Sequence, residues 1–171
     1  MTARTPYRIS FVCTGNICRS PMGEVVLRRM LDDAGLGAVV VVDSAGVGPW
    51  HAGQGADQRT LTVLARHGYD GRDHRAQQIT STWVAGRDLV LAADRGHLDR
   101  LRAQAPEGTQ ARVRLLREFD PEAVAAGELE VDDPYHAEAE GFEQCLQEVE
   151  RACRGVVEHV RQHTRSGTAT V

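Results

Sequence analysis

The sequence is marked first by what it lacks. It contains no lysine, no apolar run long enough to cross a membrane, and only four cysteines in 171 residues. Acidic residues outnumber basic ones, and the formal net charge of −4 argues against a nucleic-acid-binding surface. Residues 1–8 are polar and lack the apolar core of a signal peptide, so we expect a cytoplasmic protein that does not bind membranes.

The low cysteine count excludes a disulfide scaffold in a domain of this size. Cys145 and Cys153 fall on the apolar face of a late helix, and we interpret them as core residues. The other two cysteines lack a second Cys or His pair at zinc-like spacing, so we predict no metal site. His159 and His163 lack the glutamate of a zinc-protease motif, and we interpret them as a solvated helix end.

Length and composition favour one globular domain over residues 1–171. The hydrophobic content of 42% and the charged content of 26% are ordinary for a chain with a single core. We expect an ordered core over residues 7–163 and a flexible tail over residues 164–171.

The stretch from Val12 to Pro21 organises the chain. Apolar residues before it predict a strand over residues 8–12, and an amphipathic run after it predicts a helix over residues 21–35 with Ser20 as its N-cap. A loop that opens onto a helix N-terminus favours anions, because unpaired N–H groups point out of the helix.

This loop begins with the thiol of Cys13 and ends with the guanidinium of Arg19. The amides of residues 14–19 can line a small cup, and Gly15 and Asn16 tolerate the left-handed angles that such a cup needs. Arg19 can hold two oxygens of a phosphate. We expect Cys13, beneath convergent N–H groups, to be a thiolate, which is a nucleophile for phosphoryl transfer.

The rest of the chain alternates strands and helices. Further strands are predicted at residues 39–42, 89–92 and 113–116, and helices after Asp57, over residues 95–104 behind Asp94, and from Phe142 to Val160. The unbroken run of valines at residues 39–42 predicts a strand covered on both faces. The order predicts a three-layer, doubly wound α/β fold, with four parallel strands and helices on both faces. Ligands bind outside the carboxyl ends of such strands.

The sequence pattern does not decide the role of two residues, Asp133 and Trp50. Asp133 lies in an acidic, irregular segment, residues 119–136, and either donates a proton to a leaving group or only starts an Asp-Pro turn. Its neighbour Asp132 favours the protonated form of Asp133 by charge repulsion. Trp50, in a glycine-rich loop, is either a satellite core residue or the wall of a ligand pocket.

The run Cys-Thr-Gly-Asn-Ile-Cys-Arg-Ser-Pro at residues 13–21, with Asp-Pro-Tyr at residues 133–135, resembles the low-molecular-weight protein tyrosine phosphatase family. The likeness covers nearly the whole chain and includes residues 44–46 and 74–80. It implies that Cys13 is the nucleophile and forms a phosphocysteine, and that Asp133 is the general acid and base. Arg19 would bind phosphate and stabilise the transition state.

The resemblance also implies a phosphate-binding set, namely Thr14, Gly15, Asn16, Ile17, Cys18, Arg19 and Ser20. Ser20 would hydrogen-bond the nucleophilic sulfur. Asn16, together with Ser20, Ser44 and His74, would hold the shape of the loop. No metal and no cofactor is implied.

The substrate rim that the resemblance implies consists of Trp50 and Tyr135 on either side of a phosphotyrosine ring. His136 stands where the family often has a second aromatic residue, which makes one wall of the pocket less apolar. The partners implied are tyrosine-phosphorylated proteins. The sequence does not decide between a monomer and a weak dimer.

Cys18, five residues from Cys13, is close enough in a curled loop to form a reversible disulfide, and we interpret it as a redox partner. The alternative is a small loop residue with a steric role.

Other functions fit the residues of this chain less well. No cysteine between Cys18 and Cys145 could serve an arsenate reductase relay. Ile17 and Tyr135 favour an aromatic substrate over the phosphoarginine of a protein-arginine phosphatase. A phospholigand-binding module or a flavodoxin-like electron carrier would leave Cys13 idle.

Overall fold

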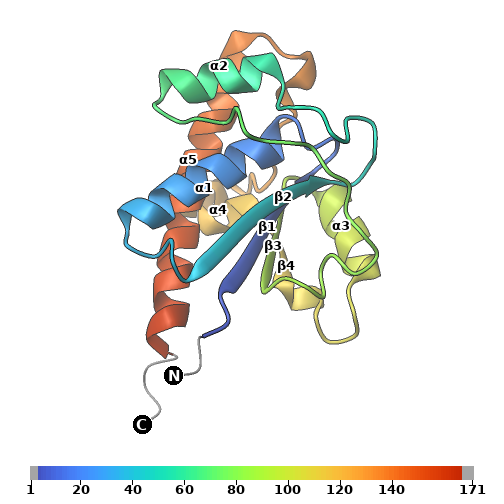
Figure 1. Cartoon of the computed structure of the whole chain (residues 1–171), viewed down its shortest axis with the longest axis vertical. Coiled ribbons are helices and arrows are strands. Elements are labelled where there is room, and N and C mark those ends of the chain that lie inside the picture. Colours follow the sequence, from blue (N-terminus) through green and yellow to red (C-terminus); the bar gives the residue numbers. More distant parts are fainter. Residues whose placement is uncertain (1–3, 167–171) are drawn as a thin grey trace.

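The computed structural model describes residues 4–166, which form a parallel four-stranded sheet with helices around it (Figure 1). The strands, in the spatial order β2-β1-β3-β4, are β1 (Tyr7–Cys13), β2 (Val40–Gly46), β3 (Leu89–Ala92) and β4 (Val113–Leu115). The helices are α1 (Arg19–Asp33), α2 (Gln58–Arg66), α3 (Arg95–Gln104), α4 (Pro121–Ala126) and α5 (Ala139–Ser166).

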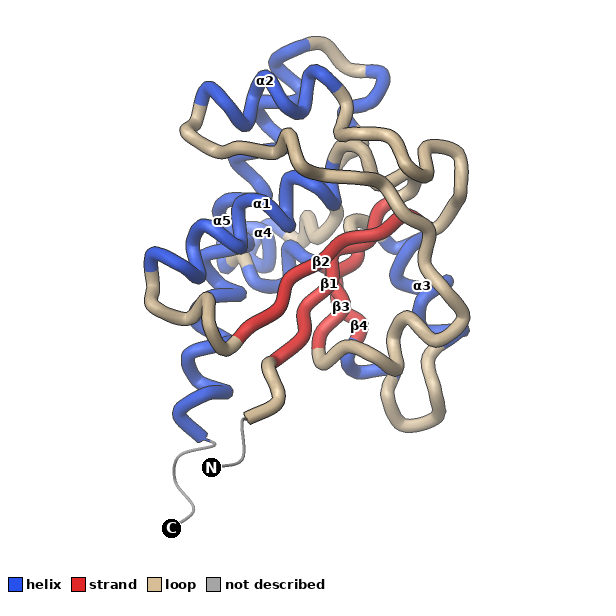
Figure 2. The backbone as a smooth tube through the Cα atoms, viewed as in Figure 1, coloured by secondary structure: helices blue, strands red, loops and turns tan. Residues whose placement is uncertain are grey.

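The central strand β1 separates two apolar cores, because alternate side chains of a strand point to opposite faces. Ile9 and Phe11 pack in the core that α1 and α5 cover, whereas Val12 packs with Leu98 and Leu101 of α3 on the other face. Figure 2 shows the strands enclosed between these helices. The predicted three-layer, doubly wound α/β fold is confirmed.

The strand order creates a crevice at one end of the sheet. β1 continues into α1 on one face, and its neighbour β3 continues into α3 on the other, so the chain diverges at their carboxyl ends. Asp94 follows β3 and caps α3, as predicted, by accepting a hydrogen bond of 3.0 Å from the main-chain N–H of His97. The loop between β1 and α1 lies beside it.

Helix α1 lies unusually close to β1. Gly23 faces the ring of Phe11, and a Cβ at residue 23 would overlap that ring. At its other end the helix stops at Asp33, two residues before the end predicted from the sequence, and Gly35 follows in the left-handed conformation with φ of 73°. The N–H of Leu36 then bonds the carbonyl of Leu31 at 2.8 Å, which satisfies one of the last helical acceptors.

The prediction that Ser20 caps α1 is wrong. The helix begins at Arg19, and Cys18 occupies the N-cap position without a side-chain hydrogen bond to the helix. The hydroxyl of Ser20 instead faces the sulfur of Cys13.

The prediction that the valine run is covered on both faces is also wrong. β2 is an edge strand, and Val39 and Val41 are 42% and 40% exposed. A β-branched run therefore indicated a strand here without indicating its place in the sheet.

The acidic segment predicted to be irregular contains α4. Asp120 caps this helix by accepting from the N–H of Glu122, Pro121 is its first residue, and Gly127 ends it with φ of 71°. The remainder, from Gly127 to the short 3₁₀ turn Pro134–His136, returns the chain to the crevice.

Helix α5 buries its apolar stripe, with Cys145 and Cys153 in the core as predicted. His159 is half-buried, contrary to the prediction: its ring packs edge-on against Phe119 and lies 3.3 Å from the hydroxyl of Tyr7. His163 is exposed, as predicted. The helix includes residues 164–166, and the rest of the predicted tail lies outside the described residues. Within residues 4–166, no helix combines the length and apolar character that a membrane span requires.

Candidate active site

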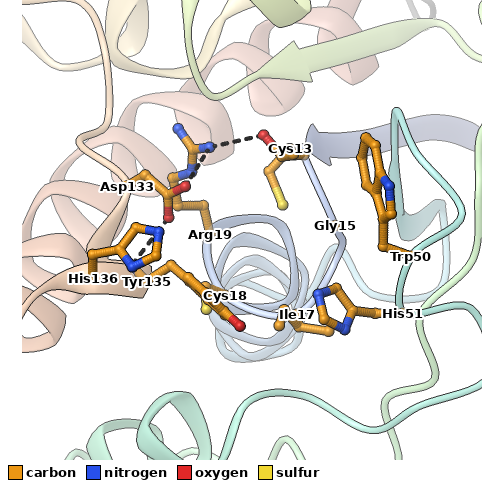
Figure 3. A pocket seen from close by; sticks show the side chains of 11 residues that line it. Cys13, Gly15, Ile17, Cys18, Arg19, Trp50, His51, Asp133, Tyr135 and His136 are labelled. Atoms are coloured by element: carbon orange, nitrogen blue, oxygen red, sulfur yellow. Dashed lines mark hydrogen bonds and ion pairs between the residues drawn. The ribbon is translucent and has the colours of Figure 1, made fainter.

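The loop between β1 and α1 forms the floor of a cavity of about 270 Å³ at the crevice. The cavity is lined by Cys13, Thr14, Gly15, Ile17, Cys18, Arg19, Trp50, His51, Asp133, Tyr135 and His136. Figure 3 shows Asp133, Tyr135 and His136 on one side of Cys13, and Trp50 and His51 on the other. The structure therefore brings together the nucleophile, the arginine, the carboxylate and the rim residues that the sequence singled out.

A hydrogen-bonded serine supports the sulfur of Cys13. Ser20 Oγ lies 2.9 Å from Cys13 Sγ and accepts a bond of 2.8 Å from the side-chain amide of Asn16. Because an amide N–H can only donate, the hydroxyl proton of Ser20 is free to point at the sulfur. This geometry gives the sulfur of Cys13 a hydrogen-bond donor.

Asn16 holds the loop in a conformation that few residues adopt. Its φ is 59°, in the left-handed region, as predicted for this position. Its amide donates to Ser44 Oγ at 2.9 Å, and its side-chain oxygen accepts from the N–H of Gln77 at 3.0 Å. His74 Nε2 lies 2.7 Å from the main-chain carbonyl of Asn16. The predicted loop supports, Ser20, Ser44 and His74, thus all converge on one asparagine.

A buried carboxylate that sequence reasoning missed organises these supports. Glu24 Oε2 accepts from Ser44 Oγ at 2.7 Å and lies 3.4 Å from His74 Nδ1. Burial raises the pKa of Glu24, but the hydrogen bonds from His74 and Ser44 outweigh it and lower the pKa overall. The only signal in the sequence was a charged residue on the apolar face of α1.

Arg19 is buried, with 5% of its side chain exposed. Its Nη1 donates to Asp94 Oδ2 and to the carbonyl of Val131, both at 3.0 Å, and its Nη2 approaches Thr14 Oγ1 at 3.4 Å. Burial lowers the pKa of Arg19, but the negative charges of Cys13, Asp133 and Asp94 outweigh it, so the pKa is raised and the guanidinium stays charged.

Asp133 starts a turn, which is one of the two roles that the sequence left open for it. It starts the 3₁₀ turn, and its Oδ1 accepts from the N–H of Tyr135 at 3.1 Å. The other oxygen, Oδ2, lies 3.6 Å from Arg19 Nη2, and about half of the side chain is exposed, at 49%. The turn thus leaves one carboxylate oxygen facing the cavity.

The rim places an aromatic residue on each side of the opening. Trp50 is 64% exposed and lines the cavity, so it is a pocket wall and not a satellite core residue. Tyr135 is 39% exposed, and its ring contacts those of His136 and His51 at centroid distances of 4.9 and 6.4 Å. His51 was not predicted as a site residue. It lies so close to Gly15 that a side chain there would collide with it.

Thr14 is oriented by a second residue that the sequence did not reveal. Thr14 Oγ1 lies 2.9 Å from Nε2 of His97, and His97 is 5% exposed. The other ring nitrogen lies 3.2 Å from Asp94 Oδ1, although it is not aligned for a hydrogen bond. Burial dominates and lowers the pKa of His97 from 6.5 to about 4, so the ring is neutral at physiological pH.

The two cysteines of the loop differ in character. Both are buried free thiols, and burial raises the pKa of Cys18 to about 12. Cys18 is therefore protonated, whereas Cys13 faces Ser20 and Arg19. Across residues 4–166 no group of three histidine, cysteine or acidic side chains is arranged to hold a metal ion.

Fold and site together define an α/β enzyme that uses a cysteine at a phosphate-binding loop. A family model for low molecular weight phosphotyrosine protein phosphatase matches residues 8–166. A low molecular weight protein-tyrosine-phosphatase of Streptomyces coelicolor is 55% identical over 164 residues, covering 95% of this chain and 99% of that protein. The chain therefore belongs to the low molecular weight phosphotyrosine protein phosphatase family.

Two further proteins are similar over most of their length. Low molecular weight protein-tyrosine phosphatase A of Mycobacterium bovis is 46% identical over 151 residues, covering 88% of this chain and 90% of that protein. The crystal structure of a protein tyrosine phosphatase from Entamoeba histolytica with Hepes in the active site superposes with a TM-score of 0.86. That structure is 28% identical and covers 92% of this chain and 99% of its own.

The buried neutral His97 predicts a loss of stability in mild acid. The unfolded chain takes up a proton on this histidine near pH 6.5, whereas the folded protein does so only near pH 4, so stability falls as the pH drops through that window. Between pH 7 and pH 5 the wild type should lose about 2 kcal/mol more than His97→Gln in urea unfolding. Replacing exposed His136 with glutamine should leave the wild-type loss unchanged. Equal losses in wild type and His97→Gln would contradict the assignment.

Proposed function

We propose that this protein hydrolyses phosphotyrosine in other proteins through a phosphocysteine intermediate. The observation that carries the proposal is the placement of Cys13 and Arg19 at the two ends of one loop, with Asp133 across the same cavity. A phospholigand-binding module would need the arginine and the amides but neither the thiol nor the carboxylate.

In the first step the thiolate of Cys13 attacks phosphorus, and the bond from phosphorus to the tyrosine oxygen breaks. Protonated Asp133 gives its proton to that oxygen, so tyrosine leaves as a neutral phenol. Arg19 and the loop amides stabilise the charge that spreads over the transferring phosphoryl oxygens, and these donors need no metal ion or other cofactor beside them.

In the second step a water molecule attacks the phosphocysteine. Asp133, now ionised, accepts a proton from that water, and the sulfur–phosphorus bond breaks. Sulfur departs with the bonding electrons, and the hydroxyl of Ser20, 2.9 Å away, stabilises the thiolate that forms. Inorganic phosphate is the second product.

The rim supports an aromatic substrate. A phenyl ring that enters between Trp50 and Tyr135 would bury apolar area on both faces, and both side chains are exposed and available in the structure. His136 makes this wall more polar than a second aromatic ring would. The substrate partners that follow are tyrosine-phosphorylated signalling proteins.

A reducing compartment suits this chemistry, because Cys13 must remain a free thiol between turnovers. We therefore propose that the protein works in the cytoplasm.

Replacing Cys13 with serine should abolish turnover while leaving phosphotyrosine binding intact, since the amides and Arg19 remain. Hydrolysis of phenyl phosphate and retention of a phosphotyrosine peptide on the immobilised variant measure the two effects. Acid-quenched wild-type enzyme should carry phosphate on Cys13, detected by mass spectrometry. Residual turnover near the wild-type rate would remove Cys13 from the nucleophile role.

Replacing Asp133 with asparagine should slow esters of weakly acidic phenols far more than esters of acidic ones. Loss of a general acid costs about 10²-fold or more with phenyl phosphate, whereas the leaving group of 4-nitrophenyl phosphate needs little protonation. The ratio of the two kcat/KM values measures the effect. If both esters slow by the same factor, Asp133 is not the acid.

We propose that Cys18 protects Cys13 from over-oxidation. Peroxide would convert Cys13 to a sulfenic acid, and the Cys18 thiol would displace water from it to form a disulfide, which a reducing thiol reverses. After peroxide treatment, dithiothreitol should restore wild-type activity but only a small part of Cys18→Ser activity. Equal recovery would leave Cys18 with a steric role.

A further inference from the structure

One arginine outside the cavity joins its two sides. Arg59 lies in the first turn of α2, with Nε at 3.0 Å from Asp57 Oδ1 and Nη2 at 2.8 Å from Asp57 Oδ2. Its remaining terminal nitrogen, Nη1, donates to the main-chain carbonyl of Tyr135 at 2.8 Å. The same planar group therefore holds a carboxylate at one edge and the turn after Asp133 at the other.

Aromatic rings hold the guanidinium in this orientation. Its central carbon lies 4.7 Å from the ring centroid of Phe142, which is buried at the start of α5, and 5.5 Å from that of Tyr135. Contacts of this kind favour a cation and restrict its rotation.

Asp57 ties this arrangement to the phosphate-binding loop. Its main-chain N–H donates to the carbonyl of Ile17 at 2.9 Å, and its side chain caps α2. A continuous series of contacts therefore runs from Ile17 through Asp57 and Arg59 to the carbonyl of Tyr135. The N–H of Tyr135 completes it by donating to Asp133 Oδ1 at 3.1 Å.

The segment that carries Asp133 is thus held at two points. Before Asp133, Val131 donates to the carbonyl of Ala93 at 2.8 Å and accepts from Arg19 at 3.0 Å. After Asp133, Arg59 holds Tyr135. A carboxylate between two anchors keeps its distance from the sulfur, whereas with the first anchor alone the turn could swing toward solvent.

We propose that Arg59 is a positioning residue that fixes the turn Pro134–His136 against the phosphate-binding loop and thereby sets how well Asp133 reaches the leaving oxygen. The inference rests on the proposed acid role of Asp133. It makes a separate claim about the turn itself, which can be measured without substrate.

The test replaces Arg59 with methionine, which keeps an unbranched apolar stem and removes the fork. The N-cap bond of α2 survives, because the donor at residue 59 is its main-chain N–H. Arg72 offers a matched control. It grips Asp70 with the same Nε and Nη2 pair, at 2.9 and 2.8 Å, but its side chain is 81% exposed.

Hydrogen exchange measures the turn directly. In Arg59→Met the N–H of Tyr135 should exchange about tenfold faster, as expected for the loss of one anchoring hydrogen bond, whereas Arg72→Met should match the wild type. Unchanged exchange at Tyr135 in Arg59→Met would overturn the proposal, whatever role Asp133 has.

Kinetics then measure the consequence. Arg59→Met should lower kcat with phenyl phosphate about tenfold and change kcat with 4-nitrophenyl phosphate less than about threefold. In the Asp133→Asn background the same substitution should have no further selective effect. Equal slowing of both esters by Arg59→Met, when Asp133→Asn is selective, refutes positioning of the acid. If Asp133→Asn is itself unselective, the acid role fails, and the catalytic part of this proposal fails with it.

Discussion

The left-handed conformation of Asn16 is the constraint on which the site depends. Its φ of 59° is one that few residues other than glycine adopt, and both polar groups of its side chain form hydrogen bonds that stabilise it. Its partners come from α1, from β2 and from the loop after α2. The site is therefore a product of tertiary structure, although its motif is contiguous in sequence.

The site also requires hydrogen-bond acceptors for the buried positive charge of Arg19. The fold supplies them from segments that are distant in sequence. Arg19 is 5% exposed and would be costly without partners. Asp94 lies between β3 and α3, and the carbonyl of Val131 comes from the segment after α4. Both hold the same nitrogen, Nη1, which leaves Nη2 toward the cavity, between Thr14 and Asp133. The arrangement orients the cation toward the place where phosphoryl charge develops.

The sequence pattern predicted the features that depend on neighbouring residues. The spacing of Cys13 and Arg19, the strand before them and the helix after them all follow from nearest-neighbour chemistry, and the fold class follows from the alternation of elements. Glu24, Gln77 and His97 escaped prediction because their roles depend on partners 20 to 83 positions away. The exposure of β2 was not predicted for a similar reason: the residues of a strand do not indicate whether it lies at the edge of the sheet. For Ser20 the pattern predicted the wrong role and the resemblance the right one: its hydroxyl faces the sulfur of Cys13 and does not cap α1.

The close approach of α1 to β1 has a consequence for how this protein can vary. Gly23 lets the helix rest directly on the ring of Phe11, so both ends of the connecting loop are fixed by packing that has nothing to do with phosphate. Five residues lie between Cys13 and Arg19 in this fixed gap. An added or deleted residue would have to shift a whole helix out of the core. The loop therefore tolerates some substitutions but not insertions or deletions.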